Sequence, residues 1–186
     1  MKKRLVIITV GKTHSGKTTF AKALEKKLVN GVVIDQDNHA QFIQTHYQSL
    51  VPKHGANTLK HAVSRLIVDY AKEHSKCDFI ICNSNLNRND REYLLKELFD
   101  EQNFIRILIH FDLPVEVLKE RVSASKRSTN IFRNDSITFK QLLQSQEAEA
   151  PIEGEADYLF AIRDSQEGNR AMEEILAIAH ERGGKI

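Results

Sequence analysis

Five short runs of apolar residues recur along the chain, and each is rich in β-branched side chains. They are Leu5–Val10, Gly31–Ile34, Phe79–Cys82, Ile105–Phe111 and Tyr158–Ile162. Runs of this length and composition predict β-strands. Their apolar character is mostly continuous rather than alternating, which is typical of strands buried on both faces in a parallel sheet.

Apolar residues at helical spacing fill the segments between these runs. Phe20, Leu24 and Leu28 follow the first strand, and further helices are predicted over Arg88–Asp100 and from Pro114 onward. A helix before the third strand carries an apolar stripe that we expect to be its buried face. The stripe consists of Leu59, Ala62, Val63, Leu66, Ile67 and Tyr70. A C-terminal helix is expected to bury Met172, Ile175, Leu176 and Ala179.

Strands that alternate with helices predict a doubly wound α/β domain built on a five-stranded parallel sheet. The 186 residues correspond to one domain, which is long enough to bury a core without disulfides or metal. The expected core spans residues 1–122 and 150–186. An insertion at 38–76 and a basic, mobile lid at 123–149 complete the predicted organisation.

Composition narrows the class of protein. The 27 Lys and Arg residues nearly balance 25 Asp and Glu, so charge alone implies no polyanionic partner. Cys77 and Cys82 are predicted to lie on one strand, too far apart to bridge, as reduced thiols of a cytoplasmic protein. The N-terminal apolar run is too short for a signal peptide, and no run approaches transmembrane length, so no membrane partner is expected.

One motif carries specific chemistry. Gly11–Thr18 fits the pattern G-x-x-x-x-G-K-[ST] and lies directly between a predicted strand and a predicted helix. In such a loop the backbone N–H groups surround phosphate oxygens, Lys17 reaches the β- and γ-phosphates, and the Thr18 hydroxyl coordinates Mg²⁺. The expected cofactors are therefore ATP and Mg²⁺, since the chain has no Asn-Lys-x-Asp motif for guanine. The residues expected to bind the nucleotide are Gly11, Lys12, Thr13, His14, Ser15, Gly16, Lys17, Thr18 and Thr19.

With this motif the chain resembles the small P-loop kinases, especially polynucleotide 5′-hydroxyl kinase and its small-molecule relatives. The segment Val32–Asp37 matches the place where these kinases carry an Asp as general base. A carboxylate there accepts the proton of the acceptor hydroxyl and orients its oxygen toward the γ-phosphate. The resemblance implies Asp37 as base and as a metal ligand beside Thr18, with Asp35 as the alternative base. A second interpretation is that one of the two acids caps the following helix.

The third strand and the turn after it also resemble these kinases, through the Asn-Leu-Asn of Asn85–Asn87. The resemblance breaks at the end of the strand, where Cys82 and Asn83 replace the Walker B Asp. Binding of Mg²⁺ would then depend more on Thr18, the phosphates and the acids after the second strand. Asn87 is expected to cap a helix, and whether Asn83 and Asn85 touch substrate stays open.

Asp112–Arg121, followed by Lys126–Thr129, resembles the strand, proline, helix and arginine-rich lid of these kinases. A guanidinium can bind two of the oxygens over which phosphoryl transfer spreads charge, and a closed lid excludes water. The resemblance implies Arg127 as the catalytic lid cation. Arg121, Lys126 and Arg133 are alternatives, and so is a solvated basic loop.

The resemblance implies transfer of the γ-phosphate of ATP to a hydroxyl of a small molecule, such as a nucleoside, sugar or antibiotic. The segment Asn38–Lys76 is expected to cover this acceptor. Its histidines are spaced by 7, 8 and 7 residues, unlike a zinc site. They are His39, His46, His54 and His61.

Other classes of function stay open. With no Trp, four Tyr and dispersed charge, a nucleic-acid acceptor is not favoured. An ATP-hydrolysing switch remains an alternative, and so does a non-catalytic nucleotide-binding protein, because the Walker B acid is missing. The sequence leaves the oligomeric state undetermined.

Overall fold

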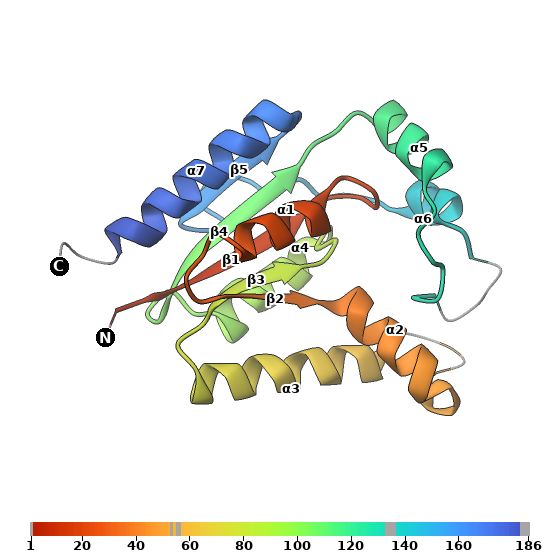
Figure 1. The fold of residues 1–186 in the computed structure, drawn as a ribbon, viewed down its shortest axis with the longest axis horizontal. Coiled ribbons are helices and arrows are strands. Elements are labelled where there is room, and N and C mark those ends of the chain that lie inside the picture. The colour runs from red at the N-terminus through yellow and green to blue at the C-terminus, as the bar shows by residue number, and fades with distance from the viewer. Residues whose placement is uncertain (1, 53, 55–56, 133–136, 183–186) are drawn as a thin grey trace.

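A five-stranded, all-parallel sheet forms the centre of the molecule (Figure 1). The structure is a computed structural model that describes residues 2–52, 54, 57–132 and 137–182. The strands lie in the order β2-β3-β1-β4-β5, and each predicted strand is confirmed to within one residue at either end. Their bounds are Arg4–Val10 for β1, Gly31–Asp35 for β2, Asp78–Cys82 for β3, Phe104–Phe111 for β4 and Tyr158–Ile162 for β5.

Helices connect the strands, as the alternating pattern predicts. Their bounds are Lys17–Glu25 for α1, Gln36–His46 for α2, Thr58–His74 for α3, Arg88–Glu92 for α4, Val115–Ala124 for α5, Phe139–Ser145 for α6 and Ser165–Glu181 for α7. A short 3₁₀ turn, η1 (Gln48–Leu50), follows α2, and a π-helical segment, η2 (Tyr93–Leu98), continues α4. Pro114 is the residue that precedes α5, and Asn87 caps α4 by accepting from the N–H groups of Asn89 and Asp90.

No helix within the described ranges is both long and apolar enough to cross a membrane.

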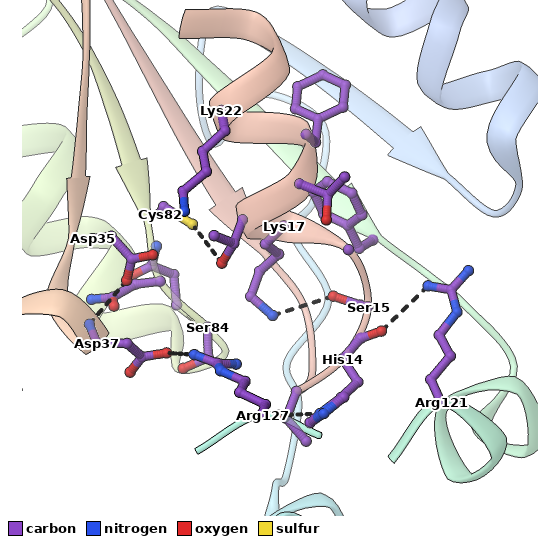
Figure 2. A pocket seen from close by; sticks show the side chains of 18 of the residues that line it. His14, Ser15, Lys17, Lys22, Asp35, Asp37, Cys82, Ser84, Arg121 and Arg127 are labelled. Carbon is purple, nitrogen blue, oxygen red and sulfur yellow. Dashed lines mark hydrogen bonds and ion pairs between the residues drawn. The ribbon is translucent and has the colours of Figure 1, made fainter. Parts of the chain in front are cut away.

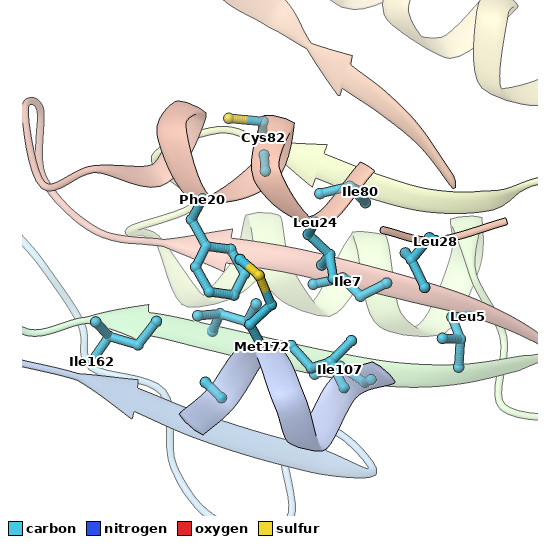
Figure 3. Packing of buried hydrophobic residues seen from close by; sticks show 14 of the residues in the cluster. Leu5, Ile7, Phe20, Leu24, Leu28, Ile80, Cys82, Ile107, Ile162 and Met172 are labelled. Carbon is cyan, nitrogen blue, oxygen red and sulfur yellow. The ribbon is translucent and has the colours of Figure 1, made fainter. Parts of the chain in front are cut away.

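The continuous apolar strands supply both faces of the core, because alternate side chains point to opposite sides of the sheet. On one face, Ile7 of β1 packs with Leu24 of α1 and Met172 of α7 (Figure 3). On the other face, Ile8 of β1 packs with Val68 of α3 and the end of η2. This two-sided cover confirms the doubly wound α/β fold.

The predicted buried face of α3 is wrong. Leu66 and Tyr70 of the apolar stripe are 70% and 65% exposed, whereas Ser64 and Val68 are buried. The inner face combines apolar and polar contacts. Val68 packs in the core with Ala71 beside it, while Ser64 bonds to His39 of α2 and Lys72 donates to the carbonyl of Leu98. The helix is therefore held in an orientation that turns much of the stripe outward.

The two cysteines are free thiols, but only one lies on the predicted strand. Cys82 ends β3, whereas Cys77 precedes its first residue, Asp78. The Asp78 carboxylate accepts from the N–H of Leu5 at 2.8 Å. This bond ties the start of β3 to the start of β1.

Arg91 of α4 is the largest fully buried side chain and has no exposed surface. Its guanidinium pairs with the Glu155 carboxylate at 2.5 Å and also donates to the carbonyls of Asn85, Leu86 and Glu149. The charge is therefore paired and its N–H groups are engaged, as burial of an ion requires. The contact joins the turn after β3 to the segment that follows α6.

Replacing this buried cation tests the arrangement. Arg91→Ala leaves the Glu155 carboxylate buried without its partner, so the free energy of unfolding is expected to fall by about 3–5 kcal/mol in a denaturant titration. Arg88→Ala is the matched control, because Arg88 forms an exposed ion pair with Glu92. The control should change stability by less than about 1 kcal/mol. Equal losses in the two variants would contradict the assigned role of Arg91.

Candidate functional site

A cavity of about 1370 Å³ opens at the carboxyl ends of the strands (Figure 2). Its wall is formed by the loop between β1 and α1, the start of α2, the turn after β3 and the segment after α5. Ligands of open α/β sheets bind at this edge, because the loops that follow parallel strands meet there. The segments that carry the kinase resemblance therefore meet in this cavity: the phosphate loop, the acids after β2, the turn after β3 and the lid segment.

The loop from Gly11 to Thr18 takes a backbone path that depends on its glycines. A Cβ on Gly11 would lie 2.9 Å from both the Phe111 Cβ and the Ser15 Oγ. Gly16 has a φ of 103° immediately before α1, a conformation that L side chains rarely adopt. No side chain in the described structure caps the start of α1, whose N–H groups therefore suit a bound anion.

Lys17 lies over this loop. Its ammonium donates to the carbonyl of Lys12 at 2.6 Å and to the Ser15 hydroxyl at 3.2 Å. Burial lowers the pKa of Lys17 to about 8 because it disfavours the charged amine, and nearby acidic groups offset this effect only in part. The amine is thus held at the loop, where a phosphate would restore its charge.

Thr18 and Cys82 meet at the end of β3. The Thr18 hydroxyl lies 3.5 Å from the Cys82 Sγ, and burial together with the charge of Asp35 raises the pKa of the thiol to about 11. A neutral thiol therefore stands where a Walker B acid would be charged. No three His, Cys, Asp or Glu side chains among the described residues gather as a metal site by themselves.

The donor set around Thr18 still fits Mg²⁺. Mg²⁺ prefers oxygen ligands and keeps several waters, and it commonly binds through one or two protein groups together with substrate phosphates. The Thr18 hydroxyl faces the same cavity as the carboxylates of Asp35 and Asp37. These oxygens and the phosphates of a nucleotide would suffice to hold the ion.

The two acids after β2 lie in different environments, although they are two residues apart. Asp35 is 4% exposed and caps α2, since its carboxylate accepts from the N–H of Asp37 at 2.9 Å. Burial raises the pKa of Asp35, and the charge of Asp37 adds to the rise. Asp37 is half-exposed and pairs with Arg127 at 2.6 Å. The helix-cap interpretation therefore holds for Asp35, and Asp37 is left facing the cavity.

Two arginines reach the site, Arg127 from the predicted lid and Arg121 from α5, which precedes it. Besides binding Asp37, Arg127 lies over the ring of Phe139, 5.2 Å from its centre. Arg121 donates to the carbonyl of His14 at 3.3 Å. Lys126 is exposed to solvent, and Arg133 lies outside the described residues. The structure thus brings Arg127 and Arg121 to opposite sides of the phosphate loop (Figure 2).

Helix α6 and Gln146, the residue that follows it, hold the phosphate loop through contacts that the sequence did not indicate. The Gln146 side chain accepts from the N–H of Thr13 at 2.8 Å, and the rings of Phe139 and His14 meet edge to face at 4.7 Å. His14 has a φ of 61°, and its Nε2 is buried without a partner in the described structure. The residues in contact are more than 120 positions apart, so no local pattern announces them.

The asparagines after β3 differ in role. Both Asn83 and Asn85 line the cavity, but the Asn85 amide is committed to the carbonyl of Thr9 at 2.8 Å. The predicted insertion contributes His61 to the cavity, whereas His39 bonds to Ser64. His46 and His54 are exposed.

Comparison with known proteins places this chain in a family. Residues 6–149 match a family described as AAA domain. No curated protein sequence matches the chain.

Several solved structures share the fold at low identity. Shikimate kinase from Bacteroides thetaiotaomicron is 16% identical with a TM-score of 0.57, over 95% of this chain and 98% of its own. A gluconokinase from Sinorhizobium meliloti is also 16% identical with a TM-score of 0.57, over 97% of both chains. Kti12 from Chaetomium thermophilum, in complex with ADP-AlF3, is 18% identical with a TM-score of 0.62, over 92% of this chain and 97% of its own. At these identities the similarity shows a common fold.

The close approach at Gly11 can be tested by adding one methyl group. Gly11→Ala forces a Cβ against the backbone and side chain of Phe111, so the free energy of unfolding is expected to fall by about 1–3 kcal/mol. Gly168→Ala is the matched control, because Gly168 lies in α7 and its Cβ would meet, among the described residues, only Ile162 of β5 at 3.7 Å. The control should be neutral or stabilising by up to about 1 kcal/mol. If chemical denaturation shows Gly11→Ala to be as stable as the parent, the assigned packing of the loop is wrong.

Proposed function

This chain belongs to the AAA domain family, and from that premise we propose that it transfers the γ-phosphate of ATP to a hydroxyl group of a small molecule. The observation that carries the proposal is the meeting of Lys17, Asp37 and Arg127 in one cavity (Figure 2). A phosphate site, a carboxylate and a guanidinium are the groups that in-line phosphoryl transfer uses. The similarity to structures named as shikimate kinase and gluconokinase supports this choice of reaction.

The nucleotide would bind along the phosphate loop. The N–H groups at the start of α1 and the Lys17 ammonium hold the β- and γ-phosphate oxygens, while Thr18 helps to hold Mg²⁺. When bound, the ion neutralises charge on the phosphates. The base of the nucleotide would lie toward Leu113, Ile162 and Met172, the apolar part of the cavity wall.

The acceptor would bind on the other side of the phosphate loop, beside α2. Its hydroxyl donates to the Asp37 carboxylate, and its oxygen attacks the γ-phosphorus as the bond to the β–γ bridging oxygen breaks. Asp37 takes the hydroxyl proton and ADP leaves. Arg127, which pairs with Asp37 in the structure, moves to the equatorial oxygens of the phosphoryl group, where a guanidinium binds two of them. Asp35 caps α2 and so keeps Asp37 in position.

Substitution of the proposed base tests the reaction class. With an acceptor found by screening hydroxyl compounds against γ-labelled ATP, Asp37→Asn is expected to lower transfer by about 10²-fold or more. Its affinity for a nonhydrolysable ATP analogue should be retained in calorimetry, whereas Lys17→Ala should lose it. Asp69→Asn makes the same chemical change at a partly exposed acid of α3 that lines neither cavity, and is the control that should keep transfer.

The same variants separate the alternatives. An ATP-hydrolysing switch would release phosphate without any acceptor and would keep doing so as Asp37→Asn. A non-catalytic nucleotide-binding protein would bind the analogue, and neither the parent nor the variant would consume ATP. A parent protein that transfers nothing above its hydrolysis rate across the screen counts against the kinase proposal.

The pKa of Lys17 gives a pH dependence for nucleotide binding. Phosphates bind the protonated amine. In the free protein Lys17 loses this proton as the pH rises through about 8. The dissociation constant for the ATP analogue should therefore increase about tenfold between pH 7 and pH 9. Lys17→Arg, whose side chain stays charged, should show a much weaker dependence over this range. Equal pH profiles for parent and variant in calorimetry would contradict the assignment.

A further inference from the structure

A second cavity of about 560 Å³ adjoins the acceptor side of the site. We call it the side cavity and define it by Asn57 and Lys60 at the start of α3 together with four apolar residues of the lid segment. These four residues are Ile131, Phe132, Ile137 and Leu142. Figure 1 shows the start of α3 and helix α6 at the same end of the molecule.

The side cavity adjoins the cavity that contains the proposed acceptor site. Lys60, Ile131, Phe132 and Leu142 line both cavities. A molecule whose hydroxyl lies at Asp37 would reach the side cavity past these shared residues. The volume lies within the roughly 300–1000 Å³ that drug-sized ligands occupy.

The polar groups around the side cavity are largely committed within the fold. The Asn57 side-chain oxygen accepts from the N–H of Lys60, and the Ser145 hydroxyl donates to the carbonyl of Leu142. The Gln141 side-chain oxygen accepts from both the N–H and the hydroxyl of Thr138. Besides the Lys60 side chain, the wall therefore offers a ligand mainly carbon, from two isoleucines, a leucine and a phenylalanine.

An aromatic chain connects this wall to the phosphate loop. The rings of Phe132 and Phe139 lie 5.0 Å apart, and Phe139 in turn contacts His14 and Arg127. The rings thus link the apolar wall to the phosphate loop and to Arg127.

From this shared wall and its chemistry we infer that the acceptor is an amphiphilic alcohol, with its hydroxyl at Asp37 and an apolar or aromatic body in the side cavity. A sugar acid or simple polyol would leave the apolar wall in contact with water. An aromatic body would displace that water and gain about 25 cal/mol for each Å² of apolar surface buried. This inference rests on the proposed kinase function and specifies its substrate class.

A graded series of alcohols tests the inference. Glycerol, benzyl alcohol and 2-naphthalenemethanol would be titrated into the protein in the presence of Mg²⁺ and a nonhydrolysable ATP analogue. Affinity is expected to rise along the series, by about tenfold or more from glycerol to 2-naphthalenemethanol, since tenfold corresponds to only about 60 Å² of buried apolar surface. The same alcohols would be offered as acceptors with γ-labelled ATP, so that binding and transfer are read separately.

Substitutions locate the effect. Ile131→Asn and Ile137→Asn each place a polar amide in the wall and should weaken binding of 2-naphthalenemethanol by about threefold or more. Both residues are partly exposed, so thermal unfolding should remain near that of the parent. Leu66→Asn, an exposed apolar residue of α3 that lines neither cavity, is the matched control and should leave the affinity unchanged.

Each outcome separates the inference from the function on which it rests. Binding that favours the aromatic alcohol and is lost in the two variants supports the side cavity, and transfer to that alcohol then supports the kinase as well. The same binding with no transfer to any alcohol supports the side cavity but counts against the kinase. Equal affinity across the series, or a preference that both variants retain, overturns the inference whether or not phosphate is transferred.

Discussion

The double pairing of β1 fixes the strand end from which the phosphate loop leaves. This strand is bonded along its length to β4 and, near its middle, to β3. Its end is tied to the turn after β3, because the Thr9 hydroxyl donates to the carbonyl of Asn83 and the N–H of Gly11 donates to the carbonyl of Ser84. The phosphate loop therefore leaves a fixed strand end, and only glycine at position 11 lets it pass so close to Phe111.

The cavity holds two kinds of ionisable group, buried ones and more exposed ones. Asp35 and Lys17 are drawn toward their neutral forms by burial, which raises the pKa of the acid and lowers that of the amine. Asp37 and Arg127 are more exposed and neutralise each other. With a neutral Cys82 in place of a Walker B acid, little negative charge is fixed beside Thr18. A phosphate entering this cavity meets Lys17 beside Asp35, where burial disfavours the charged carboxylate.

The wall that faces the acceptor is supported by a buried ion pair. Arg91 binds Glu155 and the carbonyls of Asn85 and Leu86, which belong to the turn after β3. It also binds the carbonyl of Glu149, just beyond α6. Helix α6 in turn reaches the phosphate loop, through the ring of Phe139 and the nearby Gln146 side chain. Side-chain contacts therefore join the acceptor side of the cavity, the lid segment and the phosphate loop.

Local patterns in the sequence were enough to determine the five strands, the phosphate loop and the helix cap at Asn87. Each of these depends on residues within a few positions of one another, through apolar periodicity, glycine conformation or a short side-chain bond. Tertiary structure alone decided the outward stripe of α3, the burial of Arg91, the contact of Gln146 with Thr13 and the side cavity. These features join residues tens of positions apart, and the energy of such contacts depends on which surfaces the fold brings together. The same reason separates Asp35 from Asp37: the sequence places two acids after β2, but only packing buries one and turns the other toward Arg127.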